Sequence, residues 1–220
     1  MGIKASMILI ENPNNFNNDK SLLNFLHLKD YKYSGDTTFE QCMYPRDNSI
    51  NIAYYKNCIV ICDDFQLTEQ TIRPSIHPIE RSLMQWFPQS EIISLMCHSV
   101  SNGHAYSIVK ANRTIRVKKL DADKFYFEKG KPLEQEKKIY DKKTMKGSVI
   151  GWVSDYNPDE MLSEDQLMEE FTFGIASRLL GFELFSSNND DYFMYELPFK
   201  KYIYQKPKTL TEIVMGLFKK

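Results

Sequence analysis

Glycine is scarce in this chain, and the glycine-rich motifs that bind phosphate groups are absent. Only 9 of the 220 residues are glycine, and no Gly-x-Gly-x-x-Gly or phosphate-loop pattern occurs. The Gly-x-Ser-x-Gly elbow of serine hydrolases and the His-Glu-x-x-His motif of zinc proteases are missing as well. The sequence therefore predicts no cofactor and contains no complete catalytic motif.

The Cys-x-x-Cys motif of metal and redox sites is also absent. The four cysteines, Cys42, Cys58, Cys62 and Cys97, include no Cys-x-x-Cys motif. Cys58 and Cys62 flank a β-branched run that predicts a strand, which would hold these two residues about 13 Å apart. One zinc ion cannot bridge that distance. We therefore interpret all four cysteines as reduced thiols, expect a cytoplasmic protein and predict no metal site.

The chain further lacks net charge and long apolar runs. Its 28 Lys and Arg residues nearly balance its 29 Asp and Glu residues, which argues against general nucleic-acid binding. No segment approaches the roughly 18 apolar residues of a membrane span, and the apolar run at residues 7–10 is too short for a signal peptide. We therefore expect neither nucleic acid nor a membrane as partner.

The pattern of apolar residues predicts an α+β fold. A composition of 42% hydrophobic and 26% charged residues is typical of a globular protein, and no linker divides the chain, so we expect one domain over residues 1–220. Capping residues predict helices after Pro78 and from Ser163 to Gly181. Alternating and β-branched runs predict a mainly antiparallel sheet, with strands at residues 3–10, 39–43, 51–55, 58–62, 182–185 and 192–197 and a central three-strand meander at about 91–120.

Counting residues across the turns of the meander predicts one polar sheet face. A two-residue turn at Asn102-Gly103 would pair His98 with Ser107, and a second at Asn112-Arg113 would pair Ile108 with Val117. Four polar side chains would then share a face: His98, Ser107, Arg116 and Lys118. On this face Arg116 could bind a carboxylate or phosphate, and His98 could exchange protons near neutral pH.

The same face has a simpler interpretation, as the solvated side of a half-buried sheet or as a surface covered by a helix. The predicted register also places His98 and His104 on opposite faces, which argues against a metal site built from two histidines.

Charged residues are segregated along the chain. The basic stretch 110–119 contains five basic residues and no acid, whereas the acidic stretch 155–170 contains seven acids and no base. Such segregation indicates either complementarity within the fold or a charged protein partner at one of the two stretches.

Three short motifs resemble a family of uncharacterised bacterial proteins. They are residues 1–5 (Met-Gly-Ile-Lys-Ala), residues 96–100 (Met-Cys-His-Ser-Val) with Ala105-Tyr106 on the return strand, and residues 197–199 (Leu-Pro-Phe) after an acidic helix. The resemblance would cover most of the chain, but the lysine-rich stretch 129–146 has no counterpart in it. It implies no activity, substrate or cofactor, and it marks His98 as a residue to test.

Two functional hypotheses follow. The first is a non-catalytic binding or interaction module, because the sequence combines segregated charge and many aromatic residues with no complete catalytic motif. The alternative is a small enzyme, a hydrolase or transferase acting on an anionic substrate, with His98 as acid–base group and Arg116 as anchor. Only the enzyme hypothesis requires His98, Ser107 and Arg116 to share a pocket.

Overall fold

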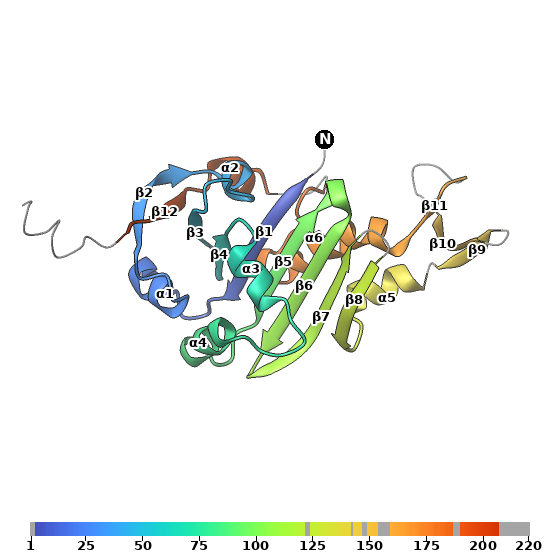
Figure 1. The fold of residues 1–220 in the computed structure, drawn as a ribbon, viewed down its shortest axis with the longest axis horizontal. Helices are drawn as coiled ribbons and strands as arrows, with labels where there is room; N and C mark the ends of the chain where they lie inside the picture. Colours follow the sequence, from blue (N-terminus) through green and yellow to red (C-terminus); the bar gives the residue numbers. More distant parts are fainter. Residues whose placement is uncertain are drawn as a thin grey trace, which may run out of the picture.

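Nine antiparallel strands form one sheet in the computed structural model of the protein, which describes residues 3–121, 124–141, 143–146, 149–153, 159–186 and 190–206. The order across the sheet is β2-β12-β3-β4-β1-β5-β6-β7-β8 (Figure 1). This arrangement confirms the predicted α+β fold with a mainly antiparallel sheet. The strands are β1 (Lys4–Glu11), β2 (Tyr31–Thr37), β3 (Ile50–Tyr55), β4 (Cys58–Cys62), β5 (Ile92–His98), β6 (Gly103–Lys110), β7 (Arg113–Asp121), β8 (Lys124–Gly130) and β12 (Phe199–Tyr204).

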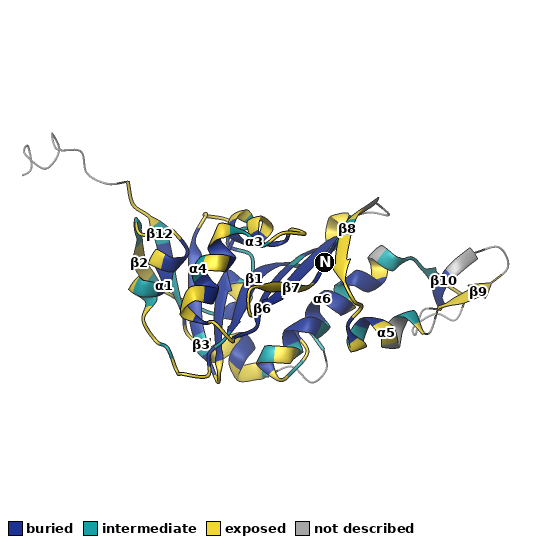
Figure 2. Ribbon diagram, turned by 90° about the horizontal axis from the view of Figure 1, so that it is seen from below, coloured by how far each residue is buried: buried dark blue, intermediate teal, exposed yellow. Residues whose placement is uncertain are grey.

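Helices cover both faces of this sheet (Figure 2). One face packs against α1 (Asp19–Phe25), α3 (Gln66–Thr71) and α4 (Pro78–Trp86). The other face packs against α2 (Phe39–Cys42), α6 (Glu164–Leu180) and the π-helical turn η2 (Tyr192–Glu196), with α5 (Glu134–Tyr140) beside α6. No helix within the described ranges is long and apolar enough to cross a membrane.

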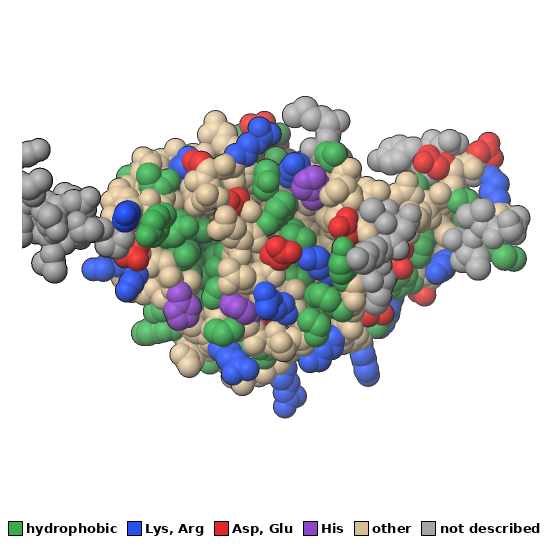
Figure 3. Space-filling view, viewed as in Figure 1, with side chains coloured by type: hydrophobic (Ala, Val, Ile, Leu, Met, Phe, Trp, Pro, Cys, Tyr) green, Lys and Arg blue, Asp and Glu red, His purple; other side chains and the backbone are tan. Residues whose placement is uncertain are grey.

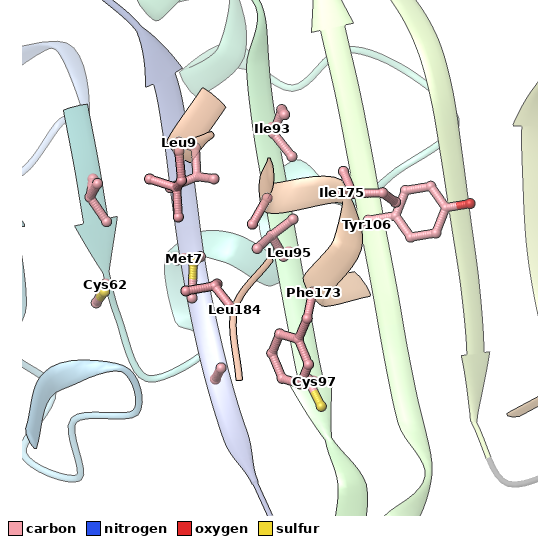
Figure 4. Packing of buried hydrophobic residues seen from close by; sticks show 14 of the residues in the cluster. Met7, Leu9, Cys62, Ile93, Leu95, Cys97, Tyr106, Phe173, Ile175 and Leu184 are labelled. Carbon is pink, nitrogen blue, oxygen red and sulfur yellow. The ribbon is translucent and has the colours of Figure 1, made fainter. Parts of the chain in front are cut away.

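The central strand β1 contributes to both hydrophobic cores. Because side chains alternate along a strand, Met7 and Leu9 face α6, whereas Ile8 and Ile10 face α1 and α4. Figure 4 shows Met7 and Leu9 on the side of the sheet where Phe173 of α6 packs. A strand buried on both faces is apolar along its length, and the sequence of β1 shows this pattern.

A second, small sheet lies beyond α5, at the right of Figure 1. Its strand order is β11-β10-β9, and both neighbouring pairs are antiparallel. The strands are β9 (Thr144–Lys146), β10 (Val149–Val153) and β11 (Met161–Leu162).

Local sequence signals place several elements correctly. Ser163 and Gln166 form the predicted capping box of α6, and Gly181 ends that helix in the left-handed conformation. Three predicted strands are wrong: residues 39–43 form α2 (Phe39–Cys42), residues 182–185 form a turn, and residues 192–197 form η2 (Tyr192–Glu196). These short apolar runs pack into the core on the α6 face of the sheet. A helical turn or a loop buries their apolar side chains there as well as a strand would, and so short a run does not distinguish these structures.

The turn between β5 and β6 is longer than predicted. Ser99 to Asn102 form a four-residue loop containing a short 3-10 turn, so that His98 pairs with Gly103 and Cys97 with His104. The predicted two-residue Asn-Gly turn is therefore wrong. Because the register moves by four residues, an even number, His98 and His104 still lie on opposite faces.

A β-bulge changes the register between β6 and β7. Ile108 pairs with Arg116 and Val109 with Thr114, so Ile115 is the extra residue. At the neighbouring strand, Gly130 (φ +90°) approaches the bulge so closely that a Cβ atom there would lie 2.0 Å from the Ile115 carbonyl oxygen. The predicted turn at Asn112-Arg113 is also wrong, because Lys110 pairs with Arg113 and the turn lies at residues 111–112. That turn alone would keep the predicted faces, but the bulge adds a slip of one residue, which pairs Ile108 with Arg116 and exchanges the two faces of β7.

Candidate functional site

The four residues predicted to share a face are separated by the bulge. His98 and Ser107 lie on the face covered by α3, whereas Arg116 and Lys118 lie on the face covered by α5 and α6. The prediction that His98 and Arg116 share a sheet face is therefore wrong. Its cause is the extra residue at Ile115, which no local sequence signal marks.

Among the described residues, no hydrogen bond or ion pair joins His98 or Ser107 to the other or to a charged side chain. The Nδ1 atom of His98 lies 2.9 Å from the Ser101 hydroxyl oxygen, and the imidazole packs near the Phe65 ring. Ser107 pairs across the sheet with Ser94 and is buried, without a hydrogen-bond partner for its hydroxyl among the described residues. Neither residue therefore has the neighbours that an acid–base pair requires.

Arg116 is part of a buried polar network. Its guanidinium donates from Nε to Glu136 at 3.0 Å, from Nη2 to Glu128 at 2.7 Å and from Nη1 to the Gly130 carbonyl at 3.0 Å. The side chain is only 1% exposed. Its donors thus hold α5 against strands β7 and β8, and Arg116 is not available to an external anion.

Lys118 connects the basic and acidic stretches within the fold. Its ammonium group donates to the Glu164 carboxylate and to the Tyr140 hydroxyl, and Tyr140 also donates to Glu164 at 2.8 Å. Burial alone would raise the pKa of Glu164, but these hydrogen bonds hold it below the usual value. The basic stretch 110–119 and the acidic stretch 155–170 are therefore joined by an ion pair within the fold, between Lys118 and Glu164.

A surface built by α1 and α4 carries the exposed tryptophan Trp86. Its side chain is 60% exposed, and its ring stacks on Phe25 of α1 with centroids 4.3 Å apart and planes tilted by 16°. Phe25 is itself buried in the core between these helices. The stack holds Trp86 in one orientation at the surface.

Cationic and titratable side chains lie on α4 itself and on the segments that follow α1 and precede α4. We define the α1–α4 surface as His27, Arg73, His77, Arg81 and Trp86. Neither arginine forms an ion pair within the described ranges, and Glu80, the only acid between residues 70 and 90, is buried. Burial, together with the charges of Arg73 and His27, lowers the pKa of His77. Figure 3 shows histidine, basic and hydrophobic side chains over α4.

On the opposite face, Cys97, His104 and Glu169 form a cluster of metal-ligating groups. Cys97 and His104 are direct cross-strand partners on β5 and β6, and Glu169 reaches them from α6. Their ligand atoms all lie within 4.8 Å of one another. Burial and the charge of Glu169 raise the pKa of Cys97, and burial raises that of Glu169.

A cleft of about 500 Å³ opens beside Glu169. Apolar side chains and further glutamates of α6 and the following turn form its walls. The lining residues are Ile3, Glu169, Glu170, Phe173, Gly174, Glu183, Leu184, Phe185 and Ser186.

Comparisons with models of known protein families, with curated proteins and with solved structures find no match to this chain. Neither the α1–α4 surface nor the cluster at Cys97 is among the sites predicted from the sequence. A tryptophan near the end of the predicted helix after Pro78 was a usable signal for the first. For the second, Cys97 and His104 flank a predicted hairpin turn, but their pairing depends on the loop length.

Proposed function

We propose that this protein is a non-catalytic interaction module that binds an acidic partner protein through the α1–α4 surface. The observation that carries the proposal is Trp86, a large apolar side chain held at the surface by stacking on Phe25. Two exposed arginines, Arg73 before α4 and Arg81 within it, form no ion pair among the described residues. Tryptophan and arginine are the residue types most enriched among those that dominate binding energy at protein interfaces.

The surface has the organisation of an interface centre. The Phe25–Trp86 stack fixes the tryptophan before binding, so little side-chain entropy is lost when a partner covers it. Arg73 and Arg81 would meet carboxylates of the partner, which steers association and excludes basic proteins. Residues 70–90 contain one acid, Glu80, and it is buried, so the exposed charge of this segment is basic. The complementary surface of a partner would therefore be acidic.

The two charged stretches are weaker candidates for the partner site. In the basic stretch 110–119, Arg116 and Lys118 are buried, and Lys110 and Lys119 pair with Glu11 and Glu69. In the acidic stretch 155–170, Glu164 is engaged by Lys118. The charges that suggested a partner surface therefore form ion pairs within the fold in part, whereas the arginines of the α1–α4 surface form none with any residue that the structure describes.

Quantitative affinity capture tests the proposal. Immobilised protein would be incubated with lysate of the source organism, and bound proteins would be compared by mass spectrometry between wild type, Trp86→Ala and the double variant Arg73→Glu/Arg81→Glu. We expect one acidic protein near stoichiometric amount with wild type, reduced about tenfold or more in both variants. Raising the salt concentration should also weaken capture.

Matched controls separate the surface from general effects. Tyr192→Ala removes an exposed aromatic side chain of η2, and Arg113→Glu reverses an exposed charge at the start of β7; both should capture the partner as wild type does. Thermal melting should show that Trp86→Ala is folded, because its side chain is mostly exposed. Capture of no protein, of nucleic acid, or of a protein that Trp86→Ala retains would contradict the proposal.

A further inference from the structure

The cluster formed by Cys97, His104 and Glu169 brings three different ligand types to one point of the core. Cys97 and His104 are each 1% exposed and face α6 from adjacent strands. Cross-strand partners hold their Cβ atoms about 5 Å apart, so the two ligands are fixed by the sheet itself. Glu169 adds a carboxylate from the helix that covers them, with all three ligand atoms within 4.8 Å.

We propose that Cys97, His104 and Glu169 bind one zinc ion. Thiolate, imidazole and carboxylate are the three side-chain ligands of zinc in proteins, bound at about 2.0 to 2.3 Å, and ligand atoms that close to one ion lie between 3 and 4 Å apart. The three ligand atoms here lie within 4.8 Å of one another, and small side-chain rotations would bring them to that spacing. The sulfur ligand disfavours magnesium and calcium, which prefer oxygen.

The electrostatics of the buried cluster also favour a cation. The half-buried carboxylate of Glu169 lies beside two polar groups that are almost fully buried, where a negative charge is less well solvated than in water. A divalent ion would neutralise the carboxylate and stabilise a thiolate at Cys97. Catalysis by a Cys97–His104–Glu169 triad is less consistent with the structure, because substrate would have to reach a sulfur that is 1% exposed.

The cleft beside Glu169 gives an ion a path to the cluster. Glu169 is half-buried and lines the cleft, whereas Cys97 and His104 lie below it in the core. Phe173, another wall residue, belongs to the same part of the core as Cys97 (Figure 4). Three protein ligands leave a fourth tetrahedral position, which water can occupy from the cleft side.

Metal titration tests this inference directly. The full chain would be treated with a chelator and then titrated with Zn²⁺ against a chromophoric competitor. We expect one equivalent to bind, with affinity lowered about 100-fold by Cys97→Ser or His104→Ala and about tenfold by Glu169→Gln. Co²⁺ should give a near-ultraviolet thiolate-to-cobalt band in wild type that is lost in Cys97→Ser.

Cys58→Ser is the matched control, because Cys58 is an equally buried strand cysteine outside the cluster. It should keep the cobalt band. If Cys97→Ser fails to fold, Glu169→Gln at a half-buried helical position still gives the test, and Zn²⁺ should raise the melting temperature of wild type more than that of this variant. Absence of stoichiometric binding, or binding unchanged in all three ligand variants, would overturn the proposal.

This inference is independent of the proposed function. The α1–α4 surface and the cluster lie on opposite faces of the sheet. Trp86→Ala should therefore bind zinc as wild type does, and Glu169→Gln should still capture the acidic partner, so failure of one proposal leaves the other testable.

Discussion

Arg116 and Glu136 form an ion pair whose two side chains are almost fully buried, with Nε and Oε1 3.0 Å apart. Breaking such a pair by removing one partner leaves an uncompensated charge in the core. We predict that Arg116→Met lowers the free energy of unfolding by about 3 to 5 kcal/mol, measured by urea denaturation.

The exposed pair of Glu134 and Lys137 on the same helix provides the comparison. Its members are mostly solvent-exposed, so Lys137→Ala should change stability by less than about 1 kcal/mol. If Arg116→Met changed the free energy of unfolding as little as Lys137→Ala, the buried network of Arg116 would not stabilise the fold.

Gly130 is predicted to be required for the bulge that separates the four sequence-predicted residues. A methyl group at this position would meet the Ile115 carbonyl oxygen, in addition to the strain of a positive φ. Gly130→Ala should therefore destabilise the protein by about 2 kcal/mol or more.

Gly181 is a suitable control for Gly130, because it also has a positive φ (+82°) but has no atom within 4 Å of the added methyl position. Gly181→Ala should cost only about 1 kcal/mol, the strain of the backbone alone. Equal losses in the two variants would show that the close approach to Ile115 has no energetic role.

Glu80 is predicted to make stability depend on pH. The carboxyl group is buried and accepts a hydrogen bond from the His77 backbone N–H at 2.7 Å; burial raises its pKa to about 7 from the usual 4.5. Between pH 4.5 and 7 the unfolded chain has lost this proton while the folded protein still holds it. Unfolding then releases a proton, and stability falls as pH rises through this window, by on the order of 2 to 3 kcal/mol.

Denaturation at pH 5, 6 and 7.5 checks this pH dependence. Glu80→Gln should flatten the profile relative to wild type, whereas Glu134→Gln, which changes an exposed carboxylate, should leave it unchanged. Parallel profiles for wild type and Glu80→Gln would contradict the prediction.

Local signals predict most of the individual elements of this fold. The capping box at Ser163, the Pro78 helix start and the apolar runs of β1 and β4 act over a few residues, so a sequence records them. The pairing of β2 with β12 joins segments more than 160 residues apart and has no local signal.

Two small features of the meander explain why the predicted shared face of His98, Ser107, Arg116 and Lys118 is wrong. The four-residue loop at 99–102 brings Cys97 opposite His104, and the bulge at Ile115 turns Arg116 and Lys118 toward α5 and α6. Both features contact residues distant in sequence: the bulge lies against Gly130, Arg116 binds Glu136, and Ser99 of the loop is hydrogen-bonded to Ile3. A single extra residue moves the following side chains of a strand to its other face. A site predicted by counting residues across turns can therefore be wrong even when every strand is predicted correctly.

Trp86 fluorescence tests the proposed binding surface most directly. The chain has two tryptophans, and Trp152→Phe leaves Trp86 as the only tryptophan, which can be excited selectively over tyrosine. Because Trp86 is 60% exposed in the free protein, its emission should be red-shifted and readily quenched by acrylamide. Adding the purified acidic partner should shift the emission to shorter wavelength and protect it from quenching. A complex that forms, as judged by its mass, without changing Trp86 emission or quenching would contradict the account.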